Sequence, residues 1–453
     1  MGIQRQEVSI LGGGLTGLLL ARMLAERDFT VSVFERSADP RTSAALEGRS
    51  INLALAERGR RALKGAGLLD AVMQATTAMP GRQIHTREGE RFFQAYGQTE
   101  HEQIYSVARS DLNIALMNAC DEIGVNIRFN ALCKDVDSDK RLAFFEDTAS
   151  GDQFSVPMNP LIAADGAGSI VRRKLNDVAG FQSDEQLLNH GYKELCIPPT
   201  DYGAYRMTPN ALHIWPRGGY MLIALPNPGG DFTATLFLPN KGAESFEQIN
   251  TGEKASRFFA EHLRDAADLM PELASDFEQN PVGIMGTIRC RKWYFGGDAL
   301  LIGDAAHAIV PFHGQGMNAA FEDCYLFGKL LDANPDSWAG LFQQFQEAQL
   351  ENANAIADMA LENYVEMRDS IRDPEFHLQK KLAFELESSV GDHFVPRYSM
   401  VMFHPEIDYL TAFRRGQVQA ELLAEFCRGK TSFASVDLPA AILAARERLP
   451  RLS

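Results

Sequence analysis

The spacing of apolar and polar residues predicts that the chain begins with alternating strands and helices. The apolar runs Glu7–Leu11 and Thr30–Phe34 flank a helical pattern at Leu18–Glu26, and this order predicts a βαβ unit with a parallel sheet. Further elements of this part are expected as strands at Ile104–Val107, Val125–Phe129 and Leu161–Ala164, and as a helix at Asp111–Ile123.

The pattern changes near residue 181. Strand-like runs separated by Pro and Gly, which predict an inserted antiparallel sheet, follow at Ala211–Trp215, Tyr220–Leu225 and Phe232–Leu238. The apolar run Ala299–Ile302 is expected to return to the first domain. After Phe321 the periodicity is mainly helical. It predicts helices at Trp338–Ala357 and Met359–Met367, with breaks at Pro396, Pro405 and Pro439.

These changes predict four segments along the chain. Residues 1–180 form the first part of an α/β domain, in which 72–105 face a second domain. The sheet of that second, substrate domain occupies 181–288. Residues 289–325 return to the first domain, and 326–453 form a C-terminal helical region.

Charge and composition narrow the class of protein. The formal net charge of −16 argues against nucleic acid as a partner, because phosphate backbones are bound by basic surfaces. No apolar run reaches the roughly 18 residues of a membrane span, and we expect neither a signal segment nor a membrane anchor. The six scattered cysteines are typical of reduced thiols, which favours a cytoplasmic protein.

An anionic cofactor bound to so acidic a chain would need a local basic cluster. Six arginines lie close enough in sequence to supply one, with ordinary solvated surface as the alternative: Arg36, Arg41, Arg49, Arg58, Arg60 and Arg61.

A glycine motif lies between the first strand and the first helix. In the G-x-G-x-x-G pattern, Gly12 permits a tight turn, Gly14 close approach of a pyrophosphate, and Gly17 close helix packing. Glu35 ends the second strand, 23 residues after Gly12, where an acid accepts hydrogen bonds from ribose hydroxyls. We therefore predict a dinucleotide site that also includes Leu15, Thr16 and Arg36. The alternatives are a plain structural turn and an exposed acid.

A second glycine-rich turn follows the run at Ala299–Ile302. Gly303 and Asp304 end that strand, and Pro311–Gly316 form a turn before a helical pattern. A helix that begins near Gly316 would direct free N–H groups and its positive dipole end at a ligand. The turn therefore favours an anionic or electron-rich group, with a ligand-free turn as the alternative.

Three motifs together resemble the flavin-dependent aromatic hydroxylases. Residues 164–172, which contain Asp165 and Arg172, resemble the family's D-G-x-x-S-x-V-R signature, and residues 303–307 resemble its G-D-A-A-H. These two motifs and the N-terminal glycines occur in the family's order and at roughly its spacing. The resemblance implies FAD as cofactor, with Asp304 on the ribitol chain and Arg109 near the flavin.

Further blocks resemble the kynurenine 3-monooxygenase branch of this family. They span nearly the whole chain, at residues 48–55, 190–195, 212–216, 311–318, 360–367 and 397–401. The resemblance implies an α/β fold, with a Rossmann-like FAD-binding domain of the aromatic-hydroxylase type, an inserted antiparallel substrate sheet and a C-terminal helical region. The family's eukaryotic members carry a C-terminal membrane anchor, and we expect none here, which favours the soluble, bacterial type.

The same resemblance assigns site residues. The carboxylate of L-kynurenine would meet Arg82, since a guanidinium matches a carboxylate bidentately, and Tyr96, Asn363 and Tyr398 would complete the polar site. Ordinary surface, core or turn positions are the alternatives. The catalytic face would comprise Pro311, Phe312, His313, Gly314 and Gln315, and the helix start at Gly316, Met317 and Asn318 would serve the isoalloxazine. No metal is expected at His307 or His313.

The implied reaction is hydroxylation of L-kynurenine at ring position 3. By the resemblance, NADPH reduces FAD, and O2 adds at flavin C4a to give the hydroperoxide that attacks the ring. NADPH would bind transiently, because the chain has one dinucleotide motif. Two alternatives stay open: an aromatic hydroxylase of a phenolic acid, and a flavin redox protein without oxygenation. The sequence is compatible with a homodimer.

Overall fold

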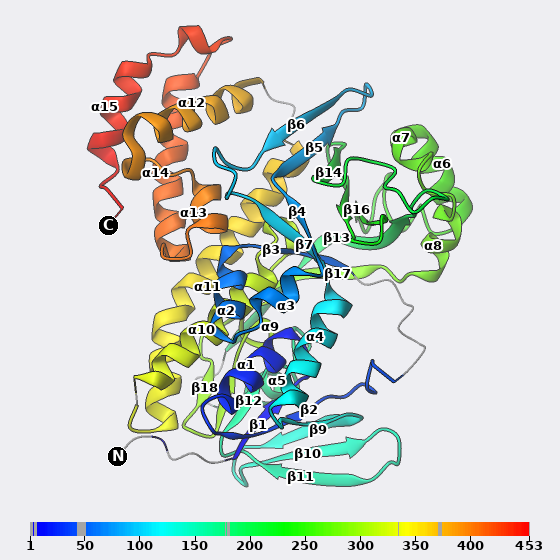
Figure 1. The fold of residues 1–453 in the computed structure, drawn as a ribbon, viewed down its shortest axis with the longest axis vertical. Helices are drawn as coiled ribbons and strands as arrows, with labels where there is room; N and C mark the ends of the chain where they lie inside the picture. Colours follow the sequence, from blue (N-terminus) through cyan, green and yellow to red (C-terminus); the bar gives the residue numbers. More distant parts are fainter. Residues whose placement is uncertain are drawn as a thin grey trace. The chain divides into compact units, whose positions relative to one another are not determined.

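The computed structural model describes residues 3, 7–42, 51–176, 178, 182–333, 335–369 and 374–452. Arg49, from the predicted basic cluster, therefore lies outside the described residues. The chain folds as two compact units (Figure 1). Unit 1 comprises residues 1–76, 106–188 and 284–357, and unit 2 comprises 77–105, 189–283 and 358–453. The predicted domain boundaries stay predictions.

The central sheet of unit 1 confirms the predicted parallel βαβ arrangement. Its strand order is β18-β19-β12-β1-β2-β8, and all neighbouring pairs except β18–β19 are parallel. The strands are β1 (Glu7–Leu11), β2 (Thr30–Phe34), β8 (Asn126–Arg128), β12 (Leu161–Ala163), β18 (Tyr294–Phe295) and β19 (Ala299–Leu301). Leu11, Ala163 and Leu301 stand in register, so three strands end at one edge of the sheet.

The helices of unit 1 begin earlier than the pattern predicted. α1 spans Leu15–Ala25 and α4 spans Arg109–Glu122. The predicted start at Leu18 was late because Thr16 and Gly17 are weak helix formers, and the predicted start at Asp111 was late because Arg109 and Ser110 are polar. The others are α2 (Glu57–Gly65), α3 (Leu69–Met73), α5 (Ile170–Leu175), α9 (Asp304–His307), the 3₁₀ helix η2 (Pro311–His313) and α10 (Gly316–Asp332).

Two small sheets were not predicted in full. An antiparallel sheet contains β9 (Ala131–Asp137), β10 (Leu142–Asp147) and β11 (Gln153–Pro157). Another has the order β3-β7-β4, with β3 (Asn52–Leu55), β4 (Thr76–Met79) and β7 (Ile104–Ala108).

A seven-stranded sheet carries the inserted antiparallel part. Its order is β17-β13-β16-β15-β14-β5-β6, formed by β5 (Gly81–His85), β6 (Arg91–Ala95), β13 (Ser183–Ile197), β14 (Leu212–Pro216), β15 (Met221–Pro226), β16 (Phe232–Pro239) and β17 (Gly283–Cys290). The predicted antiparallel pairing of the middle strands is confirmed. β5, however, joins β14 in parallel.

Helices α6 (Gly252–His262), α7 (Arg264–Ala267) and α8 (Leu273–Gln279) share an apolar core with this sheet. Phe259 and Phe277 from the helices are buried with Trp215 and Phe232 from the strands. This packing covers one face of the inserted sheet and gives unit 2 a core of its own.

The C-terminal region is helical, as predicted. α11 is one helix, Trp338–Asp369, and the predicted break at residue 358 was wrong because Asp358 continues the helical turn. The remaining helices are α12 (Pro374–Val390), η4 (Gly391–His393), α13 (Arg397–Phe403), α14 (Tyr409–Cys427), η5 (Phe433–Ser435) and α15 (Leu438–Arg448). Prolines stand at or next to the starts of α12, α13 and α15, where a missing N–H costs little. Among the described residues, no helix has the length and apolarity to span a bilayer.

None of the six cysteines, all of which lie in the described residues, forms a disulfide. All except Cys196 are buried. Burial raises the pKa of the Cys120, Cys133 and Cys290 thiols to about 12 and that of Cys427 to about 11. These thiols are therefore protonated at neutral pH.

A glycine-to-alanine pair tests how closely α1 packs on β1. A Cβ at Gly17 would lie 2.0 Å from the carbonyl oxygen of Gly12, whereas a Cβ at Gly14 would meet nothing within 4 Å. Gly17→Ala should therefore destabilise the protein by about 1–3 kcal/mol or more through overpacking. Thermal unfolding of the FAD-free protein measures the effect, with Gly14→Ala as the matched control. Equal melting temperatures for the two variants would contradict this packing.

Candidate functional site

The N-terminal glycine loop in unit 1 has the geometry of an anion site. Gly12 adopts a φ of +105°, and a Cβ there would lie 2.5 Å from the carbonyl oxygen of Ala164. Gly14 precedes α1 without a side-chain cap, and the space around its missing Cβ is open. The N–H groups of the first turn, at Leu15, Thr16 and Gly17, can therefore receive a phosphate.

Glu35 borders this loop at the end of β2. Its Oε2 accepts a hydrogen bond from the Gly13 N–H, and its Oε1 accepts one from the Ser37 N–H, both at 2.8 Å. These contacts hold the carboxylate beside the glycine loop, and each oxygen keeps a second lone pair for a hydroxyl donor. Arg36, the next residue, is exposed.

Two further acids follow the neighbouring strands β12 and β19. Asp165 accepts a hydrogen bond from the Ile170 N–H at Oδ2 (2.8 Å), while its Oδ1 is buried and has no partner in the described part of the chain. Asp304 is exposed at the start of α9. Burial raises the pKa of the Asp165 carboxyl. The positive charges of His307 and Arg109 act on the Asp304 carboxylate, so Arg109 lies near it.

Arg172 links the two motifs that carry these acids. The guanidinium is buried and donates to the carbonyl oxygens of Ala305 (3.0 Å) and Ala167. It also forms an ion pair with Glu185 at 2.7 Å. The arginine of the D-G-x-x-S-x-V-R signature thus fixes the Asp304 segment against the Asp165 segment.

A buried carboxylate that sequence reasoning missed supports the Gly303–Asp304 turn. Asp323 on α10 lies 2.6 Å from Nε2 of His307 and accepts hydrogen bonds from the Gly303 N–H (3.0 Å) and the Gln349 amide (2.8 Å). Burial opposes a charge on His307, but Asp323 outweighs it and raises the pKa of His307 above 6.5. His307 therefore has a structural partner.

The turn before α10 is built around Asn318. Its Nδ2 donates to the carbonyl oxygens of Ala54 and Gly314, both at 2.8 Å, and its Oδ1 accepts from the Ala56 N–H (2.9 Å). The Asn318 side chain thus satisfies backbone groups on both sides of the turn. The N–H groups at the start of α10 remain available to a ligand. Gly314 adopts a φ of +64°, and α10 begins at Gly316 without a side-chain cap.

The other residues of this turn differ in exposure. Phe312, His313 and Gln315 are buried, whereas Pro311 is exposed and Met317 is partly exposed. All eight predicted residues from 311 to 318 belong to unit 1, as do the glycine loop and the acids.

The four residues predicted for the substrate carboxylate all belong to unit 2. Arg82 on β5 is 7% exposed, and its Nε donates to Oε1 of Gln94 at 2.7 Å. In the described part of the chain it has no acidic partner. A buried guanidinium held by a neutral amide is costly without an anion, so the site is complementary to a carboxylate.

Two tyrosines accompany Arg82. The rings of Tyr96 and Tyr398 stack with centroids 5.4 Å apart at 18°. Burial raises the pKa of both phenols, and the positive charge of Arg82 opposes that rise. Arg82 therefore lies near both hydroxyls, which remain protonated and able to donate. Asn363 on α11 is buried and donates to the sulfur of Met367 at 3.3 Å.

Lys380 on α12 is a further cation near Arg82 that no motif indicated. Burial, together with the charge of Arg82, lowers the pKa of Lys380 to about 7, while Glu366 opposes the shift. Glu366 lies one helical turn after Asn363 on α11. This region of unit 2 thus gathers two basic groups, one acid and two phenols from β5, α11, α12, α13 and the residue after β6.

The predicted basic cluster is largely neutralised. Arg41 pairs with Asp39 and Asp121, Arg60 with Glu57, and Arg61 with Glu322. Within the described residues, no group of three or more His, Cys, Asp and Glu side chains has the geometry of a metal site.

Comparison with known proteins places the chain in a family. Residues 5–358 match the family model described as FAD binding domain. The chain is 46% identical over 448 residues to the kynurenine 3-monooxygenase of Stenotrophomonas maltophilia, which covers 99% of this chain and 98% of the relative. It is 44% identical over 450 residues to the kynurenine 3-monooxygenase of Xanthomonas axonopodis pv. citri, with the same coverage.

Solved structures share the fold at lower identity. The tetrameric form of 2-methyl-3-hydroxypyridine-5-carboxylic acid oxygenase has a TM-score of 0.67 at 19% identity, over 85% of this chain and 98% of that one. Pseudomonas aeruginosa PqsL in complex with 2-aminobenzoylacetate has a TM-score of 0.64 at 19% identity, over 80% and 96%. The architecture is that of FAD-dependent oxygenases, and the chain belongs to the FAD-binding family and, within it, to the kynurenine 3-monooxygenases.

Proposed function

We propose that this protein hydroxylates L-kynurenine at ring position 3, using FAD, NADPH and O2. The observation that carries the proposal is Arg82, a buried guanidinium without an acidic partner among the described residues. An α-amino acid substrate supplies the missing carboxylate. A non-oxygenating flavin protein would have no need for such a group.

The residues of unit 1 fit FAD. The open space at Gly14 suits the pyrophosphate, and the uncapped start of α1 suits its charge. Glu35 is held where ribose hydroxyls can donate to it, and the orphaned Oδ1 of Asp165 is a further acceptor for a polar ligand group. Asp304 would accept from the ribitol chain. When bound, FAD supplies the transfer of electrons from NADPH to O2 and of oxygen to the ring.

The chain's own residues have three tasks in this reaction. Arg82, Tyr96 and Tyr398 would bind and orient the substrate through its carboxylate. The N–H groups at the start of α10 would stabilise negative charge on the reduced flavin ring. The buried side chains of Phe312, His313 and Gln315 would keep water from the reacting atoms. The aniline nitrogen of kynurenine activates its own ring, so no strong base is needed.

Turnover with the purified, FAD-loaded protein tests the function. We expect L-kynurenine to stimulate NADPH oxidation and to yield 3-hydroxykynurenine, identified by mass. 4-Hydroxybenzoate, a phenolic acid without the amino acid group, should do neither. Hydroxylation of 4-hydroxybenzoate, or NADPH oxidation without any hydroxylated product, would contradict the proposal.

Arg82→Met tests the carboxylate assignment. Loss of the guanidinium should weaken L-kynurenine binding by about 2–4 kcal/mol, the cost of removing one partner of a buried charge pair. FAD should stay bound, because Arg82 belongs to unit 2. Titration of the flavin spectrum with L-kynurenine measures the affinity. The control is Arg257→Met, since the Arg257 side chain is 73% exposed. Equal affinities in the two variants would refute the assignment.

Asp323→Asn tests the support of the Gly303–Asp304 turn. The change removes the charge that faces His307 and the Gly303 N–H, and it should weaken FAD binding by about 1.5–3 kcal/mol, roughly 10- to 150-fold. The FAD dissociation constant measures this by fluorescence. Asp332→Asn, on the exposed face of the same helix, is the matched control. FAD affinity equal to that of wild type would contradict the role of Asp323.

The pair of His307 and Asp323 also predicts how the stability of the protein depends on pH. A group whose pKa is raised on folding stabilises the native state fully below its unfolded pKa, and this contribution is lost as the pH rises through the raised value. The stability difference between wild type and Asp323→Asn should therefore be largest below pH 6.5, the ordinary pKa of histidine, and decrease above it. Melting temperatures between pH 6 and 9 would show this.

A further inference from the structure

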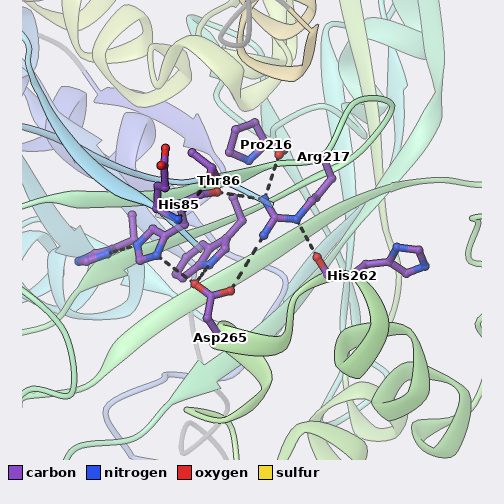
Figure 2. Close-up of polar contacts among 9 residues, drawn as sticks. His85, Thr86, Pro216, Arg217, His262 and Asp265 are labelled. Carbon is purple, nitrogen blue, oxygen red and sulfur yellow. Dashed lines mark hydrogen bonds and ion pairs between the residues drawn. The ribbon is translucent and has the colours of Figure 1, made fainter. Parts of the chain in front are cut away.

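A buried chain of hydrogen bonds lies behind strand β5, outside the site described above. His85 Nδ1 lies 3.2 Å from Asp265 Oδ2, and His85 Nε2 lies 2.8 Å from His213 Nδ1. His213 Nε2 lies 2.8 Å from the carbonyl oxygen of Thr208. The two histidines are 2% and 1% exposed, and Figure 2 shows His85 directed at Asp265. Every member belongs to unit 2.

The number of protons in this chain follows from its two ends. A carboxylate and a carbonyl oxygen both accept hydrogen bonds, so three contacts in series require three N–H protons. Two neutral imidazoles supply only two. The chain can therefore close completely only when the histidine pair binds one added proton, opposite the negative charge of Asp265. Loss of that proton leaves one contact with two facing lone pairs, and that contact must open.

The surroundings locate the added proton on His85. Burial lowers the pKa of His85, with Arg91 and Arg217 acting in the same direction and Asp265 against it. Burial also lowers the pKa of His213 to about 4. Although burial favours its neutral form, hydrogen bonds from His85 and Trp215 hold the pKa of Asp265 at about 2. Asp265 is thus ionised. The pKa of His85 lies below 6.5, so His85 loses its added proton as the pH rises through that lower value.

The same cluster fixes the end of β5. Arg217 donates to the carbonyl oxygens of His85 and Pro216, both at 3.0 Å, and to that of His262 at 2.7 Å. Trp215 donates to Asp265 at 2.9 Å and stacks on the His85 ring at 4.1 Å. Figure 2 shows Arg217 reaching all three carbonyl groups. The contacts join β5 to β14 and to the ends of α6 and α7.

Arg82 shares this strand but lies on its other face. β5 pairs in register with β14, Gln83 opposite His213 and Arg82 opposite Leu212. Because side chains alternate along a strand and paired residues share a face, His85 lies with His213 and Arg82 on the opposite side. The other neighbour of β5 is the edge strand β6, which is mostly exposed. The position of Arg82 therefore depends on the attachment of β5 to β14 and to the histidine chain.

We propose that the chain of His85, His213 and Asp265 positions Arg82 for the substrate carboxylate, and that its closed form carries one added proton. The inference rests on the proposed function, because it takes the carboxylate at Arg82 to be that of L-kynurenine. Opening of the chain releases the end of β5 and displaces the guanidinium. Affinity for the carboxylate therefore falls as the pH rises through the titration of His85.

Binding to the FAD-loaded protein between pH 5 and 6.5 tests this, with L-kynurenine and with kynuramine, the same molecule without its carboxylate. His85 titrates in this range, because its pKa lies below 6.5, whereas Lys380 beside Arg82, with a pKa of about 7, stays mostly protonated. For wild type, L-kynurenine should bind about tenfold more tightly at pH 5 than at the highest pH tested. A factor of this size is expected when a positioned group is slightly displaced. Kynuramine should bind equally at every pH. In His85→Gln, L-kynurenine should bind about tenfold more weakly than to wild type at pH 5, with a flat pH profile and unchanged kynuramine affinity. His101→Gln, an exposed histidine in the same 77–105 segment, is the matched control and should resemble wild type.

The outcomes separate the two proposals. No binding of L-kynurenine to wild type at any pH would refute the proposed function itself. Binding with the same pH profile in wild type and His85→Gln would overturn the positioning role alone, as would an equal loss of affinity for both ligands. If His85→Gln fails to fold, Asp265→Asn takes its place. Without the carboxylate that raises the pKa of His85, the midpoint of the L-kynurenine profile should move to lower pH, and an unmoved midpoint would overturn the inference.

Discussion

The parallel pairing of β1, β12 and β19 is the constraint on which the cofactor site depends. Leu11, Ala163 and Leu301 stand in register, so the segments that follow the three strands emerge side by side at one edge of the sheet. These segments are the glycine loop, the Asp165 motif and the Asp304 motif, which are far apart in the sequence. Ligands of open parallel sheets bind at this edge for the same geometric reason.

Polar contacts then fix those segments relative to one another. Arg172 joins the second and third, Asp323 holds the turn of the third, and Asn318 joins the start of α10 to residues 54–56. In each case a side chain satisfies backbone groups of a neighbouring loop, which would otherwise be buried without partners. The loops that follow these strands are thus held by side-chain hydrogen bonds as well as by their attachment to the sheet.

The sequence was sufficient for the elements with a strong local signal. The strands of the parallel sheet and the antiparallel pairing of the inserted sheet followed from apolar runs and turn residues. Asp165 and Asp304 could be recognised because their motifs are short and contiguous. Asp323 and Lys380 could not be recognised, because the role of each depends on a group that is distant in the sequence and that it faces only in the fold. Likewise, the parallel addition of β5 to β14 depends on tertiary pairing between residues about 130 positions apart, which leaves no periodic trace.

The buried thiols affect how the protein tolerates its own chemistry. A flavin enzyme that handles O2 is exposed to peroxide whenever reduced cofactor reacts without substrate. Peroxide oxidises thiolates rather than thiols, and burial keeps Cys120, Cys133, Cys290, Cys324 and Cys427 protonated. Cys324 lies on α10, beside Asp323 and within the helix that supports the flavin turn. The packing that shapes the core therefore also gives the catalyst durability against oxidative damage from unproductive turnover.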